Sequence, residues 1–179
     1  MRNLKPEEAE LVFTKLSNYI GDNLEKLLKQ EDEHVFQIIK DRVYFMSKSL
    51  CNQSTTLNKE CILSAGILLG KFTHSGKFRL HVTALPVITP FAQNKVWVKQ
   101  SSELSFMYGK NITKAGLARM TENTPAHQGV LVMNMNNHAI GFGVSAKSTA
   151  DTTVCDPSSI VVYHQDDIGT YLRDEASIV

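Results

Sequence analysis

The residues best suited to bind a ligand form an alternating segment near the middle of the chain. Across residues 77–84 apolar and polar side chains alternate, which is the two-residue period of a half-buried strand. Residues 74–76, His-Ser-Gly, suit a three-residue hairpin loop that makes Lys71 oppose Arg79. One face of this hairpin therefore carries a row of polar and cationic side chains, namely Lys71, Thr73, Lys77, Arg79 and His81.

This row lies in the most basic part of the chain. Residues 71–119 contain eight Lys or Arg against Glu103 alone, whereas residues 1–41 and 120–179 are both net acidic. Like charges that oppose each other destabilise a hairpin, and a bound polyanion or an acidic protein surface would relieve the repulsion. The alternative interpretation is a solvated edge strand, where Lys is common.

A second candidate is the segment 95–99, Lys-Val-Trp-Val-Lys, which places the one tryptophan between two cations. An aromatic ring beside phosphate-binding cations is how single-stranded nucleic acid is held without sequence preference. A single Trp in a small protein is also a common core residue, so base stacking and core packing both stay open for Trp97.

The sequence contains no recognisable catalytic or metal-binding motif. The six histidines have no His-x-x-His spacing, no Ser lies in a Gly-x-Ser-x-Gly motif, and Cys51, Cys61 and Cys155 have no Cys-x-x-Cys spacing. Segment 140–148 fails as a P-loop because Ala146 replaces the second glycine, and it also fails as a dinucleotide site and as an RNA-recognition motif. We therefore expect neither an enzyme nor a disulfide framework, and no metal ion or cofactor.

Periodicity and turn residues predict the elements that position these side chains. Pro6 and apolar residues at helical spacing predict a helix that ends near Gly21. Residues 145–153 show no convincing helical pattern, and we place a domain boundary between residues 94 and 95. The patterns predict strands at 35–39, 42–46, 95–99, 130–135, 139–145 and 160–164, a buried strand over the apolar run 62–70, and helices at 47–53, 111–117 and 167–175.

Composition indicates a globular protein of a reducing compartment. The 179 residues are 42% apolar and 21% charged, with a formal net charge of +1. No apolar run approaches the roughly 18 residues that span a bilayer, and the N-terminus lacks the layout of a secretory signal. We expect an intracellular protein that does not insert into a membrane.

Several stretches resemble a known family. Segments 106–117 and 119–123, followed by 128–132 and 140–144, resemble a PUA domain. Nearly the whole chain is similar to the nuclear-import-protein-seven family, which are nucleolar assembly factors of the large ribosomal subunit. The further segments that carry this similarity are 70–73, 77–85, 146–149 and 162–165.

The resemblance implies an α+β fold, with an N-terminal α/β domain on an antiparallel sheet over residues 1–94 and a C-terminal PUA pseudo-β-barrel over residues 95–179. It implies non-enzymatic binding of uridine-rich single-stranded RNA during pre-ribosomal RNA processing and biogenesis of the large (60S) subunit. The implied partners are pre-ribosomal RNA, the pre-large-subunit particle and nucleolar ribosome-assembly proteins, the last docked partly through the N-terminal domain. The implied location is the nucleus and nucleolus, and we expect a monomer.

The resemblance also implies candidate RNA-binding residues. In PUA domains RNA commonly follows the first helix and the strand after a Gly-x-Gly turn, which correspond here to residues 110–119 and 146–148. Archaeal relatives carry several basic residues in the latter stretch, whereas this chain keeps only Lys147, so we expect the hairpin to share the task. The predicted RNA-binding set is Lys71, Lys77, Arg79, Lys99, Lys110, Lys114, Arg119 and Lys147.

We expect these cations to converge after folding into one groove that binds the phosphates of an unstacked strand. One alternative is a protein-interaction module of pre-ribosomes whose PUA face no longer binds RNA, which the acidic flanks would suit. A second alternative is an RNA-modifying enzyme, since PUA domains often accompany such activities, although residues 1–94 contain no recognisable catalytic motif.

Overall fold

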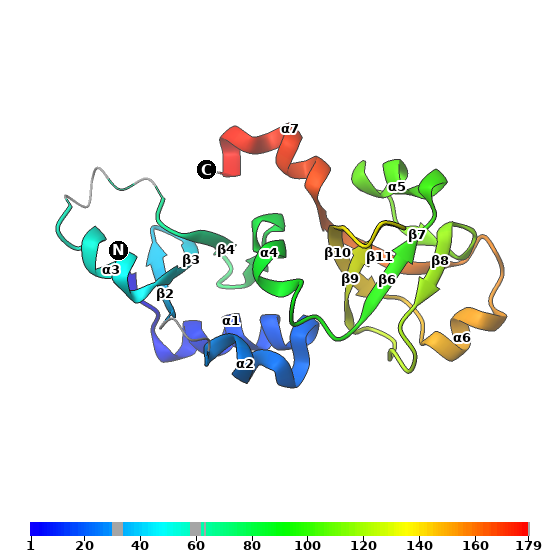
Figure 1. Ribbon diagram of the computed structural model, residues 1–179, viewed down its shortest axis with the longest axis horizontal. Coiled ribbons are helices and arrows are strands. Elements are labelled where there is room, and N and C mark those ends of the chain that lie inside the picture. The colour runs from blue at the N-terminus through cyan, green and yellow to red at the C-terminus, as the bar shows by residue number, and fades with distance from the viewer. Residues whose placement is uncertain (30–33, 58–61, 63, 179) are drawn as a thin grey trace.

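The computed structural model describes residues 1–29, 34–57, 62 and 64–178, so the predictions that involve Cys61 lie outside the described residues. The chain forms two β-sheets that follow one another along the long axis of the molecule, each with its own helices (Figure 1). This is the predicted α+β arrangement.

The N-terminal sheet has five antiparallel strands in the order β1-β2-β3-β4-β5. Helix α1 packs its apolar side against one face of this sheet. The strands are β1 (Arg2–Asn3), β2 (His34–Ile39), β3 (Arg42–Ser47), β4 (Ile67–Phe72) and β5 (Phe78–Leu80). The helices are α1 (Pro6–Ile20), α2 (Leu24–Leu28), α3 (Lys48–Ser54) and α4 (Leu85–Ile88), with 3₁₀ turns at Gly21–Asn23 and Val82–Ala84.

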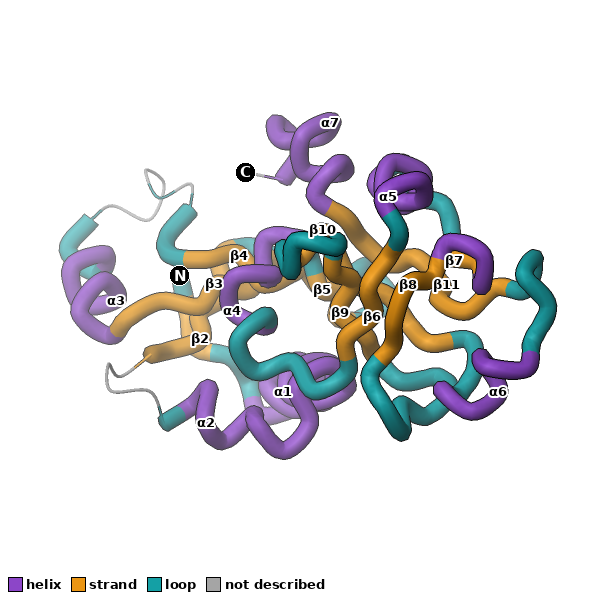
Figure 2. Tube along the Cα trace, turned by 45° about the vertical axis from the view of Figure 1, so that its right-hand side comes forward, coloured by secondary structure: helices purple, strands orange, loops and turns teal. Residues whose placement is uncertain are grey.

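The C-terminal sheet has six strands in the order β7-β11-β10-β9-β6-β8, and β6 and β9 are the parallel pair. The edge strands β7 and β8 are joined by a 3₁₀ turn at Lys114–Gly116, which nearly closes the sheet into a barrel (Figure 2). The strands are β6 (Lys95–Val98), β7 (Ile112–Thr113), β8 (Leu117–Met120), β9 (Gly129–Met133), β10 (Ala139–Ser145) and β11 (Ile160–Asp167). The helices are α5 (Gln100–Met107), α6 (Thr149–Val154) and α7 (Ile168–Ile178). The predicted pseudo-barrel is confirmed.

Helix α1 begins and ends where the sequence predicts. Pro6 takes the first helical position, where a missing N–H costs little. Glu8 accepts the backbone N–H of Lys5 at 2.9 Å and two N–H groups of Arg2 at 2.6 and 2.7 Å. The helix stops before Gly21, which adopts a positive φ of 53°.

We expect Glu8→Gln to lower the free energy of unfolding by about 0.5 kcal/mol at pH 7, because the ion pair with Arg2 lies at the surface. The Arg2 guanidinium holds the pKa of Glu8 at about 2, below its ordinary value of 4.5. A lowered folded-state pKa means that this stabilisation is present above pH 4.5 and is lost as the pH falls toward 2. Urea denaturation of both proteins at pH 7 and pH 3 measures it, and an unchanged difference at the lower pH would contradict this account.

Two predicted elements, the strand over 62–70 and the helix over 111–117, differ from the structure. The apolar run 62–70 does not form one strand, because Gly66 adopts a φ of +78° and β4 begins only at Ile67. The helix predicted over 111–117 is replaced by β7, the 3₁₀ turn and β8. Local polarity there resembles a helix, but pairing with β11 and β6 draws the backbone into the barrel.

Helices α5 and α6 are not predicted by the sequence patterns. Only Phe106 of α5 is buried, so the helix has no apolar stripe that a periodicity could reveal. Helix α6 starts with Ser148, whose Oγ accepts the backbone N–H of Asp151, and it buries only Thr152. Neither helix has the amphipathic pattern from which the sequence could predict it, and of the two only α6 has a side-chain cap.

One hydrophobic core joins the two sheets. It combines Leu16 of α1 with Leu131 of β9, and the rings of Tyr19 and Phe142 meet edge to face with centroids 5.3 Å apart. Alternate residues of β9 divide between two cores: Leu131 and Met133 join the shared core, whereas its neighbours Val130 and Val132 fill the interior of the barrel. The shared core holds the two sheets in a defined relation.

Helix α7 returns the chain to the N-terminal half (Figure 1). Its residue Tyr171 packs against apolar clusters of the N-terminal sheet, although the helix follows directly from the last strand of the barrel. The predicted closing helix is confirmed, with an end at Ile178.

Candidate nucleic-acid interface

The cations of the predicted hairpin lie on neighbouring strands. Lys71 in β4 faces Arg79 in β5, as predicted, and on its other side it faces Arg42 in β3. Cross-strand partners lie on the same face of a sheet, so three cationic side chains stand in a row. The predicted hairpin is confirmed by the hydrogen bond from the backbone N–H of Thr73 to the carbonyl of Lys77, at 2.9 Å.

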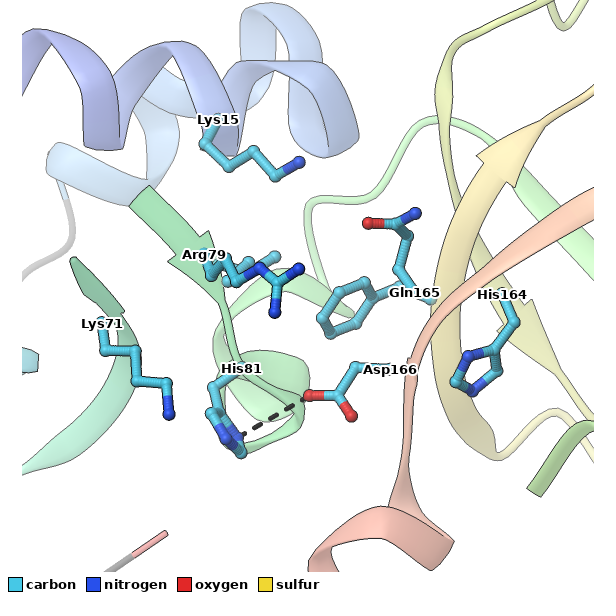
Figure 3. A pocket seen from close by; sticks show the side chains of 9 residues that line it. Lys15, Lys71, Arg79, His81, His164, Gln165 and Asp166 are labelled. Atoms are coloured by element: carbon cyan, nitrogen blue, oxygen red, sulfur yellow. Dashed lines mark ion pairs between the residues drawn. The ribbon is translucent and has the colours of Figure 1, made fainter. Parts of the chain in front are cut away.

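The row leads into a cleft of about 380 Å³ between the two sheets, which we call the interdomain cleft (Figure 3). Figure 3 shows Lys15, Lys71 and Arg79 extending toward this space from the N-terminal half. Gln165 and Asp166 of β11 form part of the opposite wall. The cleft therefore combines side chains from α1, β4, β5 and the last strand of the barrel.

A histidine and a carboxylate face each other inside the interdomain cleft. The Nδ1 atom of His81 lies 3.7 Å from Oδ2 of Asp166, which is beyond a hydrogen bond. The same oxygen accepts the backbone N–H of Val82 at 2.7 Å. Burial lowers the pKa of His81 and raises the pKa of Asp166, while the attraction between the two groups opposes both shifts. Burial thus favours the neutral form of the His81 imidazole.

The lysine and arginine side chains of the cleft have no acidic partner in the part of the chain that the structure describes. Among the described residues, no carboxylate lies within ion-pair distance of Lys15, Lys71 or Arg79. Lys15 is half-buried, and its burial, followed by the positive charge of Arg79, lowers its pKa. The three cations outnumber Asp166, the one carboxylate of the described lining, and an excess of positive charge between low-dielectric walls attracts anions.

Two of the predicted cations of the barrel lie at the beginning of β11. The backbone N–H of Lys114 donates to the carbonyl of Ser159 at 2.9 Å, one residue before that strand. The backbone N–H of Ala146 donates to the carbonyl of Val161 at 2.7 Å, which brings Lys147 to the other side of the strand. Lys114 and Lys147 therefore flank β11 where it starts.

Lys99 also lies near this end of the barrel, whereas Lys110 lies further along β11, next to Asn111, which accepts the backbone N–H of His164. The Nζ of Lys99 donates to the carbonyl of Ala115 at 2.8 Å, so Lys99 neighbours the turn that contains Lys114. Lys110 is exposed in the connection between α5 and β7. Sequence position alone does not predict the bond that engages Lys99.

Trp97 combines features of both interpretations that the sequence leaves open. The ring is half-buried, packs against the shared core, and donates from Nε1 to Oδ1 of Asn137 at 2.7 Å. The guanidinium carbon of Arg119, its cross-strand partner, lies 3.8 Å from the ring centroid. A base could stack on this face of the ring only if it displaced the Arg119 guanidinium.

The described contacts place four of the predicted cations in two groups. Lys71 and Arg79 lie in the interdomain cleft beside Gln165, near the end of β11, whereas Lys114 and Lys147 lie near its start at Ile160. Five steps of about 3.3 Å along a strand separate the two positions by roughly 17 Å. A ligand that touches both groups must therefore run along the barrel, and convergence into one groove stays a prediction.

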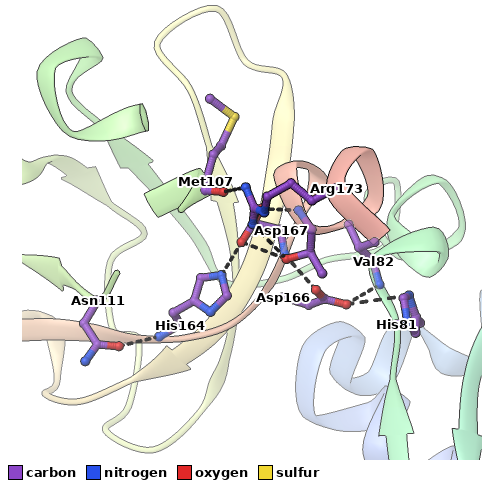
Figure 4. Close-up of polar contacts among 9 residues, drawn as sticks. His81, Val82, Met107, Asn111, His164, Asp166, Asp167 and Arg173 are labelled. Atoms are coloured by element: carbon purple, nitrogen blue, oxygen red, sulfur yellow. Dashed lines mark hydrogen bonds and ion pairs between the residues drawn. The ribbon is translucent and has the colours of Figure 1, made fainter. Parts of the chain in front are cut away.

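A buried polar network at the junction of β11 and α7 positions the wall of the cleft (Figure 4). Nε2 of His164 lies 2.6 Å from Oδ2 of Asp167, and Asp167 is fully buried. The backbone N–H of His164 donates to Oδ1 of Asn111 at 2.9 Å. Arg173 of α7 donates to the carbonyl of Met107 at 2.7 Å and approaches Asp167 to 3.7 Å. Gln165 and Asp166 are thus held between anchored neighbours.

Sequence reasoning misses several residues of the cleft. Lys15 belongs to a helix, and its spacing from the hairpin gives no sign that they meet. Arg42 follows a strand turn that the sequence does predict, and its charge just after the loop at Lys40 is the one local signal that could have found it. Asp166 and Gln165 arrive by long-range folding of β11.

No group of three or more His, Cys, Asp or Glu side chains in the described part of the chain is arranged to hold a metal ion. No helix of that part is long and apolar enough to cross a bilayer. Cys51 and Cys155 are both free thiols.

Two family models match this chain. Residues 1–82 match the NIP7/UPF0113 pre-PUA domain, and residues 94–176 match the UPF0113 PUA domain. Together these models cover most of the sequence, and the boundary between them falls in the segment that links the two sheets.

Curated relatives are similar over nearly their full length. A protein of Dictyostelium discoideum named 60S ribosome subunit biogenesis protein NIP7 homolog is 47% identical over 176 residues, which is 98% of each chain. The 60S ribosome subunit biogenesis protein nip7 of Schizosaccharomyces pombe is 44% identical over 179 residues, which is 99% of each chain.

Solved structures share the fold at low sequence identity. A PUA domain from Aeropyrum pernix K1 matches 99% of this chain and 90% of its own, with a TM-score of 0.63 and 12% identity. A PUA domain protein from Thermoplasma acidophilum matches 96% of this chain and 95% of its own, with a TM-score of 0.58 and 12% identity. These likenesses concern the arrangement of both sheets.

Proposed function

This chain belongs to the NIP7 family of 60S ribosome subunit biogenesis proteins, and from that premise we propose that it is a non-enzymatic, RNA-binding factor of large-subunit assembly. Its ligand is uridine-rich single-stranded RNA, and its role lies in pre-ribosomal RNA processing. The observation that carries this proposal is the basic interdomain cleft, whose cations have no described acidic partner and adjoin the barrel.

Binding proceeds by electrostatic capture of the RNA backbone, followed by contacts to unstacked bases. Phosphate contacts set affinity and position, whereas base edges and stacking supply preference for a sequence. Lys71, Lys77 and Arg79 contact phosphates on the N-terminal side. On the barrel side the proposed contacts are Lys99, Lys110, Lys114, Arg119 and Lys147.

The two halves divide the work in this proposal. Residues 95–179 bind RNA, and residues 1–94 dock nucleolar assembly proteins while their hairpin reaches the RNA. The protein acts as a monomer on the pre-large-subunit particle in the nucleus and nucleolus. The names of the relatives, which refer to 60S subunit biogenesis, support this assignment.

We expect the affinity of the full chain for a decamer of uridine to fall steeply with salt. For single strands, the logarithm of the binding constant falls by about 0.7 per phosphate neutralised for each tenfold rise in salt, so five contacts give a slope of roughly −3.5. Fluorescence anisotropy between 50 and 300 mM KCl (~sixfold range) measures the slope. Tight binding that ignores salt, or no binding to the decamer, would overturn the proposal.

One observation favours a second candidate, a protein-interaction module without direct RNA binding. Lys99 is already hydrogen-bonded to a carbonyl and Arg119 already covers Trp97, so two of the barrel cations are engaged within the chain. This candidate predicts no measurable affinity for the decamer but retained association with pre-large-subunit particles. The same titration, followed by sedimentation with such particles, separates the two candidates.

A further inference from the structure

Lys15 lies in an environment that is energetically unfavourable for a positively charged side chain. It projects from α1 into the interdomain cleft, is half-buried, and stands near Arg79 with no described carboxylate within ion-pair distance (Figure 3). Bringing a desolvated ammonium next to a guanidinium costs free energy in the folded state. An anion that enters the cleft would offset this cost.

We propose that the interdomain cleft binds a phosphate group of the RNA strand, with Lys15 completing a site that Lys71 and Arg79 begin. This inference rests on the proposed function, because it assigns one phosphate of the bound strand to a definite place. Three donors from α1, β4 and β5 surround one end of the cleft, and Arg42 extends the row on β3. Lysine and arginine recognise phosphate as a point charge and through paired N–H groups, respectively.

The carboxylate of Asp166 on the opposite wall would repel a bound phosphate. His81 can offset this repulsion. Its Nδ1 faces that carboxylate at 3.7 Å, is buried, and has no hydrogen-bond partner among the described residues. The charged groups that face His81 are Asp166 from β11, Lys71 from β4 and Arg42 from β3. A bound phosphate favours the imidazolium form, whose Nδ1–H can then pair with Asp166 and offset its charge.

The size of the cleft suits a small polar group. Phe142 lines the cleft, and behind it lies Tyr19, whose ring meets Phe142 edge to face and whose buried hydroxyl has no partner among the described residues. The volume of about 380 Å³ falls within the roughly 300–1,000 Å³ of pockets that hold small ligands. Because the shared core holds both walls, the site is formed before RNA arrives.

The deciding variant is Lys15→Met, which keeps the length of the side chain and removes its charge. We expect it to weaken binding of the uridine decamer about tenfold at 100 mM KCl (~0.1 M), the effect of one charge-assisted phosphate contact. The melting temperature should stay unchanged or rise, because the buried charge is gone. Lys26→Met, at an exposed site on α2, removes the same charge and should alter affinity less than about twofold.

A second experiment tests whether binding of the decamer is coupled to protonation of His81. Affinity of the wild-type chain for the decamer should increase as the pH falls from about 7.5 to 5.5, since binding takes up a proton on a group whose pKa is lowered in the free protein. His81→Gln should flatten this dependence. An identical pH profile in the variant would overturn the role of His81.

The source of the phosphate is settled by repeating the titration with uridine 5′-monophosphate. Loss of affinity for the decamer alone, on Lys15→Met, supports a phosphodiester within the strand, and loss for both ligands supports a site for phosphate from either source. Decamer binding that equals wild type in Lys15→Met overturns the cleft site but leaves the proposed function standing. No binding of the decamer by the wild-type chain overturns the proposed function itself.

Discussion

Leu131→Ala is expected to destabilise both halves of the molecule together, by about 3 kcal/mol, although Leu131 belongs to a strand of the barrel. Its side chain is 1% exposed and lies in the core that α1 and the N-terminal sheet share with β9 and β10. Truncation leaves a cavity at the contact between the sheets that the surrounding helix and strands can fill only partly. If the shared core makes the two sheets one cooperative unit, every probe must report the same transition.

The measurement uses one reporter in each half. Fluorescence of Trp97, the one tryptophan of the chain, follows the barrel, and hydrogen exchange of the β2 and β3 amides follows the N-terminal sheet. Both should shift to the same lower midpoint in urea. Leu104→Ala is the matched control, since this leucine is 64% exposed on α5 and should change stability by less than about 0.5 kcal/mol. Two separate midpoints in the variant would show that the sheets unfold independently.

The parts of the fold that sequence predicts well are those fixed by local pattern. Strand β10 has the predicted bounds, because the turn at residues 135–137 separates it from β9 and an apolar run follows that turn. The hairpin that pairs Lys71 with Arg79 follows from a three-residue loop and the period of two. The same reasoning fails at residues 111–117, where pairing with strands far along the chain decides the conformation.

The same contrast between local pattern and long-range contact applies to the candidate site. The pairing of Lys71 with Arg79 is local and is predicted, whereas the arrival of Lys15 requires that α1 pack over the edge of β5. Asp166 reaches the cleft only because the barrel closes and the shared core sets the angle between the sheets. The periodicity of α1 and β11 does not predict that Lys15 and Asp166 line the same cleft. The set of cations chosen from the sequence therefore omits Lys15.

The separation of the cations into two groups also has a physical reason. Strand β11 crosses the whole barrel, so residues at its two ends contact different surroundings. Lys114 and Lys147 meet the turns at its start, and the interdomain cleft meets its end. A contiguous basic stretch in sequence does not stay contiguous when a barrel folds through it, so a ligand that contacts both groups must follow the surface of the barrel.

The second large effect on stability is expected at the junction of β11 and α7, next to the wall of the interdomain cleft. Asp167→Ala is expected to lower the free energy of unfolding by about 4 kcal/mol, because a fully buried carboxylate with several partners is removed. Oδ1 of Asp167 accepts the backbone N–H of Thr170 at 2.8 Å and so caps the start of α7. Oδ2 lies 2.6 Å from Nε2 of His164, and Arg173 approaches to 3.7 Å.

Asp167→Asn separates the cap from the charge. Its amide oxygen can still accept the Thr170 N–H, so the loss should shrink to about 2 kcal/mol, with the remainder due to the weaker contacts to His164 and Arg173. Urea denaturation gives both differences, and hydrogen exchange of α7 shows whether the helix detaches before the sheets unfold. Equal losses in the two variants would mean that the charge, rather than the cap, holds α7, and a loss below about 1 kcal/mol in Asp167→Ala would contradict the anchoring role altogether. Because Asp166 precedes this anchor directly, release of α7 should also weaken binding in the interdomain cleft, which ties the stability of the junction to the geometry of the proposed phosphate site.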